Sequence, residues 1–337
     1  MAITAAELKT RPLTQLLAPK TLDQIILLPR IHDLIKTGEI HDNFLFYGPA
    51  GTGKSTLARL LASKYVVLYV NASLDGSIDT LRNGITDFAS ENSIPMEGVN
   101  PQKVLYLDEI DGASPSFFDA FRGVTEMYPD LRIIGTANKF YKLQKYEYIT
   151  SRFECISFLP INSEERIWAV GKYKSQFKKI SKGIGLTFES DDVVDYVIKR
   201  KFPDYREIYK FIQRMYKTVP KGTVITMEMV AGAVYEYIDL YKMIINMATT
   251  AEKFHEYLVI NYSDKVQEVI ESLDSEFIAW MMEEAPQYNN VIGELVISNA
   301  QHQCMLATCM DQTTVMKSLA FIYHGMIKKQ NLSQASK

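Results

Sequence analysis

The chain has 337 residues, of which 47% are hydrophobic and 23% charged, the balance of a folded globular protein with room for two or three domains. Its formal net charge of −3 requires any contact with nucleic acid to come from a local basic surface, because the overall field repels phosphate. Three cysteines without CxxC spacing, together with the lack of a long apolar run or an apolar leader, predict a protein of a reducing cytoplasm that is neither secreted nor membrane-spanning.

Short apolar strands alternate with helices in the first half of the chain, after a lead-in over residues 1–20 that we expect to be irregular. The strands are expected at residues 43–47, 66–71, 104–107, 133–136 and 156–158. The helices between them are expected at residues 55–64, 78–90 and 116–127. This alternation predicts an α/β fold, with a parallel sheet that is covered by helices on both faces.

The pattern becomes almost entirely helical after residue 160. Helices are expected at residues 163–180, 190–200, 204–217 and over most of 226–335. Residues 219–222 contain a proline and a glycine, which interrupt helices, so we interpret this segment as a linker. The sequence therefore predicts three domains, at residues 1–160, 161–220 and 221–337.

Residues 48–55 match the phosphate-binding pattern G-x-x-x-x-G-K-[ST] between a predicted strand and a predicted helix. Glycines let such a loop curl around an anion, and the N-terminus of the following helix adds positive potential. Lys54 is expected to reach the β- and γ-phosphates of ATP, and the Ser55 hydroxyl to bind Mg²⁺. The alternative is a glycine-rich turn that matches by chance, in ~1% of chains. The predicted nucleotide-binding residues of this segment are Gly48, Pro49, Ala50, Gly51, Thr52, Gly53, Lys54, Ser55 and Thr56.

Asp108 and Glu109 directly follow the apolar strand predicted at residues 104–107. Acids are tolerated there because open α/β sheets bind ligands at the carboxyl ends of their strands. Asp108 is expected to hold Mg²⁺, mainly through water, and Glu109 to orient and deprotonate the attacking water. This pair favours an ATPase over a small-molecule kinase, which has less use for a base aimed at water. The alternative is a solvated pair of acids at a strand end.

Taken together, these segments resemble an AAA+ ATPase of the sliding-clamp-loader family over about residues 15–217. Within that family, the runs at residues 85–90, 136–139 and 202–206 are most similar to the large subunit of T-even phage loaders. The resemblance implies an AAA+ P-loop domain followed by a helical lid and a helical collar. It also implies a homo-oligomer with a distinct small loader subunit, arranged around primer–template DNA and a ring-shaped sliding clamp.

The same resemblance implies roles for individual polar residues. Asn138, in the sensor-1 segment, would polarise the attacking water or the γ-phosphate. Arg152 would reach the ATP of a neighbouring subunit, and Arg206 would contact the γ-phosphate from the lid. Ion pairs within the chain are the alternative for both arginines. Leu17 and Ala18 replace the Tyr-Arg of the family before its N-terminal proline, so the sequence does not identify the residues that hold adenine.

Candidate contacts to macromolecules also come from the resemblance. Thr80 and Arg82 lie where the family has a helix that faces DNA, and Arg122 corresponds to an arginine that contacts the neighbouring nucleotide or relays a DNA contact. Ile94 and Met96 occupy the place of a clamp-contacting plug. The alternatives are an ordinary capped helix, a surface arginine and a loop folded back on the core.

The function that this sequence predicts is an ATPase that uses ATP and Mg²⁺ to open a ring clamp and load it onto primer–template DNA. Two other functions stay open. One is a different AAA+ DNA motor, such as a helicase loader or a branch-migration ATPase, which acts without a clamp. The other is a nucleotide-gated scaffold that binds ATP but barely hydrolyses it.

Overall fold

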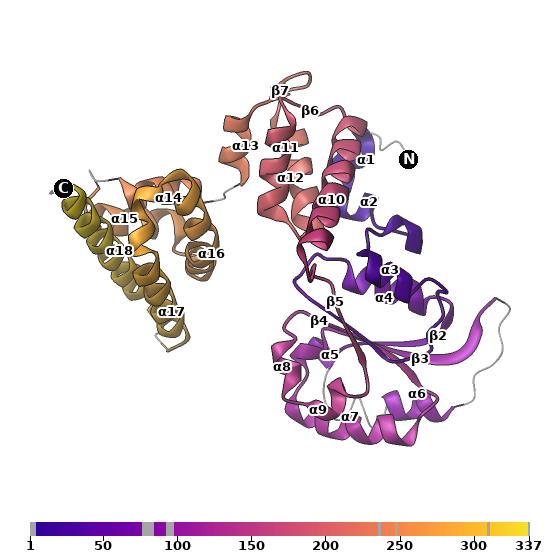
Figure 1. The fold of residues 1–337 in the computed structure, drawn as a ribbon. Coiled ribbons are helices and arrows are strands. Elements are labelled where there is room, and N and C mark those ends of the chain that lie inside the picture. The colour runs from indigo at the N-terminus through magenta and orange to yellow at the C-terminus, as the bar shows by residue number, and fades with distance from the viewer. Residues whose placement is uncertain are drawn as a thin grey trace. The chain divides into compact units, whose positions relative to one another are not determined.

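A computed structural model describes residues 5–75, 84–91, 98–234, 237–246, 249–308 and 311–335 (Figure 1). The chain separates into two compact units, Met1–Val230 and Ala231–Lys337. The first unit carries a parallel sheet and helices, and the described part of the second is helical. The predicted order, an α/β domain followed by helical regions, is confirmed.

The first unit is built on a parallel sheet, which has five strands in the described residues, in the order β2-β3-β4-β1-β5. All strands predicted for this region are present. They are β1 (Phe44–Tyr47), β2 (Tyr65–Asn71), β3 (Asn100–Asp108), β4 (Arg132–Ala137) and β5 (Glu154–Ser157). β1 pairs with β4 on one side and β5 on the other, and the P-loop follows it directly. The sheet order therefore brings the loop beside the carboxyl ends of β3 and β4.

Helices cover both faces of this sheet, as the continuous apolar strands require. Phe46 and Tyr106 pack on one face with α3 (Pro29–Leu34) and α4 (Lys54–Ala62). Leu45 and Leu107 pack on the opposite face with the helices after β3, which are α7 (Pro115–Met127), α8 (Tyr141–Gln144) and α9 (Glu147–Thr150). Shorter elements on the way are α5 (Ala72–Asp75), α6 (Thr86–Ser90) and the 3₁₀ turn η3 (Ile110–Gly112).

The expectation of an irregular lead-in is wrong. The structure has short helices there, α1 (Ala5–Thr10) and α2 (Leu13–Leu16), and the 3₁₀ turn η1 (Leu22–Gln24) follows just after it. Leu13 is fully buried, and its N–H donates a hydrogen bond of 3.0 Å to the side-chain oxygen of Gln213. Helices this short are not stable alone, so they form because they pack against a distant helix.

The helices expected after the sheet are α10 (Ser163–Gly183), α11 (Asp191–Lys201) and α12 (Tyr205–Thr218). Two short strands between and after them, β6 (Thr187–Phe188) and β7 (Val224–Ile225), pair in parallel and were not predicted. Because β7 returns to β6 and Ile225 is fully buried, the segment at residues 219–222 does not end the first unit, which continues to Val230. The division of that unit at residue 160 stays a prediction.

The described part of the second unit contains helices only, as predicted. Its helices are α13 (Met227–Val234), which begins in the first unit, α14 (Ile238–Ile245), α15 (Ala251–Tyr262), α16 (Val266–Glu284), η4 (Pro286–Val291), α17 (Ile292–Thr308) and α18 (Gln312–Ala335). Phe277, Leu295 and Tyr323 are fully buried in it. Over the described residues, the helices are too short or too polar to traverse a membrane.

Candidate active site

The P-loop follows β1 and leads directly into α4. Gly48, Gly51 and Gly53 have φ angles of 142°, 74° and 97°, which residues with a side chain seldom adopt. Lys54 folds back over the loop, and its Nζ donates a hydrogen bond of 2.7 Å to the carbonyl oxygen of Pro49. The glycines of the motif therefore sit where the backbone needs them, and the start of α4 faces the space that the loop encloses.

Lys54 is nearly buried, with 5% of its surface exposed. Burial, followed by the positive charge of Arg206, lowers the pKa of Lys54 to about 8, against the opposing effect of Asp111 and Asp108. A phosphate group placed in this loop would favour the charged form of the lysine again. The electrostatic environment of Lys54 is thus suited to an anionic ligand.

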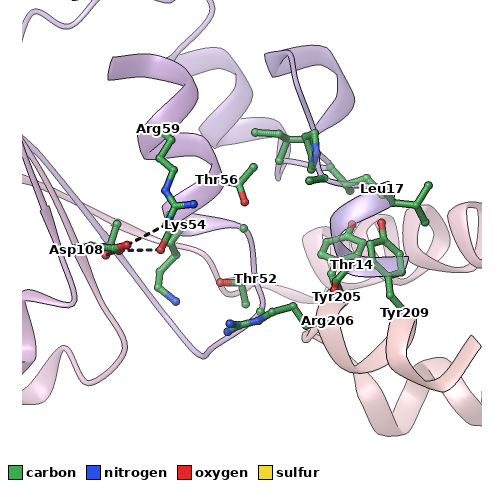
Figure 2. A pocket seen from close by; sticks show the side chains of 18 of the residues that line it. Thr14, Leu17, Thr52, Lys54, Thr56, Arg59, Asp108, Tyr205, Arg206 and Tyr209 are labelled. Carbon is green, nitrogen blue, oxygen red and sulfur yellow. Dashed lines mark hydrogen bonds and ion pairs between the residues drawn. The ribbon is translucent and has the colours of Figure 1, made fainter. Parts of the chain in front are cut away.

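Asp108 ends β3 and is the centre of a polar cluster. Its Oδ1 accepts hydrogen bonds from the Ser55 hydroxyl at 2.8 Å and the Thr136 hydroxyl at 2.5 Å. Its Oδ2 lies 3.6 Å from Nη2 of Arg59 (Figure 2) and 3.5 Å from the Tyr69 hydroxyl. Carboxylate and hydroxyl oxygens are ligands that Mg²⁺ prefers. Ser55 and Asp108, predicted as metal ligands, lie side by side and fit that ion.

Glu109 is the one described non-glycine residue with positive φ, at 55°. This left-handed conformation is costly for a residue with a side chain, and such positions cluster at active sites. The Glu109 N–H donates to the Thr136 hydroxyl at 3.0 Å, and its Oε2 accepts a hydrogen bond of 2.8 Å from the Ser73 hydroxyl. Glu109 is thereby placed in the wall of the pocket.

Asn138 and Arg206 line the same pocket but come from different parts of the first unit, the end of β4 and the start of α12. Asn138 follows β4, and its N–H donates to Oδ1 of Asp111 at 3.0 Å. Arg206 is the second residue of α12. Figure 2 shows its side chain extending from that helix towards the P-loop, beside Thr52. The structure therefore brings a residue from the sheet edge and one from the helical region to the phosphate-binding loop.

The pocket has a volume of about 460 Å³. Most of the predicted nucleotide and catalytic residues line it, namely Gly51, Thr52, Gly53, Lys54, Ser55, Thr56, Asp108, Glu109, Asn138 and Arg206. Three residues of the loop do not line this pocket, namely Gly48, Pro49 and Ala50. Predicted residues as far apart in the sequence as Gly51 and Arg206, which are 155 positions apart, thus line one cavity.

The other predicted residues lie elsewhere. Nη2 of Arg152 forms an ion pair of 2.7 Å with Oε1 of Glu126, and the Nε of Arg122 lies 3.3 Å from the same oxygen. Arg152 also donates to the carbonyl oxygen of Tyr148 at 2.9 Å. Within its own chain Arg152 thus forms an ion pair, which was the alternative interpretation of this residue. Its action on the ATP of a neighbouring subunit stays a prediction. The DNA and clamp candidates Thr80, Arg82, Ile94 and Met96 lie outside the described residues.

Sequence reasoning missed the apolar end of this pocket. Tyr205 and Tyr209 stand one turn apart on α12, with ring centroids 6.1 Å apart, and Figure 2 shows them beside Thr14 and Leu17 of the lead-in. The wall continues through Ala18, Pro19, Ile25 and Ile26. Aromatic and aliphatic walls suit a planar base. The spacing of the two tyrosines was a signal in the sequence, whereas nothing there placed the lead-in beside them.

The sheet domain matches a known protein family. Residues 44–161 match the family AAA, described as "ATPase family associated with various cellular activities". These residues are therefore similar to the ATPase domains of the AAA family. The match begins at β1 and ends just after β5, so it contains the P-loop, both acids and Asn138.

The chain is also similar to replication proteins. It is 30% identical over 207 residues to "Replication factor C small subunit 2" of Pyrobaculum islandicum, covering 58% of this chain and 60% of that protein. It is 27% identical over 293 residues to "Replication factor C small subunit" of Staphylothermus marinus, covering 82% and 84%. With "Replication factor C subunit 3" of Saccharomyces cerevisiae the identity is 35% over 158 residues, covering 43% and 45%.

The chain spans 60–66% of the length of the Pyrobaculum small subunits 2 that it matches. Among solved structures, the "RuvB Holliday junction branch migration motor" of Thermotoga maritima has a TM-score of 0.45 at 18% identity, over 80% of this chain and 88% of that one. The similarity to the AAA family is confined to residues 44–161, whereas the similarity to replication factor C subunits extends over up to 293 residues.

Proposed function

We propose that this chain is an ATPase subunit of a sliding-clamp loader. It would use ATP binding and hydrolysis to open a ring-shaped clamp and load it onto primer–template DNA. The observation that carries the proposal is the pocket in which the P-loop, Asp108, Glu109 and Arg206 converge. The similarity to replication factor C subunits supports the choice of a clamp loader among AAA ATPases.

ATP would lie across the whole pocket. Its phosphates would meet the N–H groups of the P-loop and Lys54, and its adenine would lie at the apolar end beside Leu17, Tyr205 and Tyr209. Ser55 and Asp108 would hold Mg²⁺, which neutralises charge on the phosphate oxygens when bound. The pocket volume of about 460 Å³ falls in the range of small-molecule sites.

For hydrolysis, Glu109 would accept the proton of the attacking water, and Asn138 would orient that water. Arg206 would stabilise charge on the γ-phosphate from the same chain. Arg152 of an adjacent copy would add a second guanidinium, a contribution of roughly 10³–10⁵ in rate. Its ion pair with Glu126 joins side chains that are 33% and 51% exposed, so exchanging Glu126 for a phosphate costs little.

Several finer assignments belong to the same proposal. They are the similarity to T-even phage loaders, assembly of several copies with a distinct small subunit, a lid that begins at residue 161, and a collar formed by the second unit, Ala231–Lys337. DNA would contact Thr80, Arg82 and Arg122, and the clamp would contact Ile94 and Met96. Tracking a duplex from inside a spiral needs phosphate contacts and no base readout.

The test is the steady-state ATPase rate of the protein with its cognate small subunit, with and without primer–template DNA and clamp. We expect the two ligands together to stimulate far more than the product of their separate effects. Stimulation by DNA alone, with an inert clamp, would favour another AAA+ DNA motor. Binding of ATP without turnover under any condition would favour a nucleotide-gated scaffold.

A further inference from the structure

The start of α12 lies directly on the P-loop. The N–H of Tyr205 donates a hydrogen bond of 3.0 Å to the carbonyl oxygen of Gly51. A Cβ atom at Gly51 would overlap the carboxylate of Asp204. The side chain of Asp204 therefore occupies the space that any larger residue at position 51 would need, and the two segments, 153 residues apart, are in van der Waals and hydrogen-bond contact.

The same carboxylate caps the helix that carries Arg206. Oδ1 of Asp204 accepts hydrogen bonds from the N–H of Arg206 at 2.7 Å and the N–H of Glu207 at 3.1 Å. The N–H of Asp204 donates to the carbonyl oxygen of Lys201 at 2.8 Å, which ties the cap to the end of α11. Asp204 can therefore move away from Gly51 only by breaking these cap hydrogen bonds or by carrying the start of α12 with it.

We propose that Asp204 is a positioning residue that couples the P-loop to Arg206. Its carboxylate lies between Gly51 and the backbone of Arg206, so a shift of either segment displaces the other. The phosphate-binding loop thereby sets the position of the guanidinium that approaches it from α12. The inference rests on the proposed ATPase function, and it gives the glycine at position 51 a second role beside its φ angle of 74°.

A double-mutant cycle with Gly51→Ala and Asp204→Gly tests this coupling. Glycine at an N-cap loses little helix stability relative to aspartate, and it removes the atoms that the methyl group introduced at position 51 would meet. We expect Gly51→Ala to weaken binding of a fluorescent ATP analogue by about tenfold or more, through backbone strain and displacement of α12. Adding Asp204→Gly should restore a large part of that loss. Additive effects of the two changes would overturn the proposal.

Two further readouts separate positioning from general stability. Asp204→Asn keeps the shape and the cap and should retain kcat, whereas Asp204→Gly should lower kcat more than it raises KM. The effect of Asp204→Gly on kcat should vanish in an Arg206→Ala background, because the residue acts through Arg206. A persistent effect in that background would contradict the proposal.

A nucleotide-free measurement keeps the test independent of binding. Hydrogen exchange of the Tyr205 amide in the full chain should be slow in the parent, fast in Gly51→Ala and slow again in the double variant. Equal exchange in all three would refute the contact. If the parent binds ATP but the cycle is additive, only this inference fails; if the parent binds no ATP, the proposed function fails, and the inference with it.

Discussion

Replacing Thr136 with valine should destabilise the first unit and reduce ATP hydrolysis. Thr136 lies in β4 with 1% of its surface exposed. Its hydroxyl donates to Oδ1 of Asp108 at 2.5 Å and accepts the N–H of Glu109 at 3.0 Å. One buried hydroxyl thus orients both acids of the site. Valine keeps the side-chain shape and removes both hydrogen bonds.

The magnitude follows from the two lost partners. A hydrogen bond to a charged group contributes about 1.5–3 kcal/mol, and an ordinary hydrogen bond, such as that of the part-buried Glu109 N–H, about 0.5–1.5 kcal/mol. We therefore expect the free energy of unfolding to fall by about 2–4.5 kcal/mol. That is a large share of the ~5–15 kcal/mol of a typical domain, and it should lower the midpoint of urea unfolding by about 1 M or more.

The assay is urea unfolding followed by circular dichroism, together with steady-state ATPase measurements. Thr136→Ser is the matched control, because it keeps the hydroxyl and loses a methyl group, at a cost of about 1 kcal/mol. Thr136→Val should also lower kcat, since Asp108 and Glu109 lose their common support. The reasoning is refuted if Thr136→Val unfolds within about 0.5 kcal/mol of the parent, or if serine destabilises as much as valine.

Three more predictions concern the charged groups of the site and its partners. Glu109→Gln and Arg152→Ala should each lower ATPase activity, by roughly 10³-fold or more for the arginine. A mixture of the two variants should regain activity, because some sites would combine an intact Glu109 with an intact Arg152 from the neighbouring copy. An inactive mixture would argue against action in trans. Phosphate binds the protonated form of Lys54, whose pKa is about 8 in the free site. The affinity for ATP should therefore fall by up to tenfold per pH unit above about pH 8. A binding affinity for an ATP analogue that stays constant from about pH 7 to about 9.5 would contradict this prediction. Arg82→Ala should weaken DNA-stimulated turnover and spare basal turnover, and equal loss of both would remove Arg82 from the DNA contacts.

The sequence by itself determined the sheet and the chemistry along its edge. Short apolar runs predicted the five described strands of the large sheet, because a strand covered on both faces must be apolar throughout. The P-loop could be identified from the sequence because its glycines and Lys54 lie in a single short segment. Asp108 and Glu109 could be identified because charges beside a buried strand are tolerated at its carboxyl end, where the sheet binds ligands.

The tertiary structure decided which distant segments meet at that edge. It brings Thr136 to Asp108, Leu17 to Tyr205, and Asp204 to Gly51. It also made helices of the lead-in, and it extended the first unit beyond the predicted linker through the pairing of β6 with β7. Each of these features depends on contacts between residues far apart in the chain, and local patterns carry no information about such contacts. A four-residue helix such as α2 forms only when another part of the fold covers its apolar side.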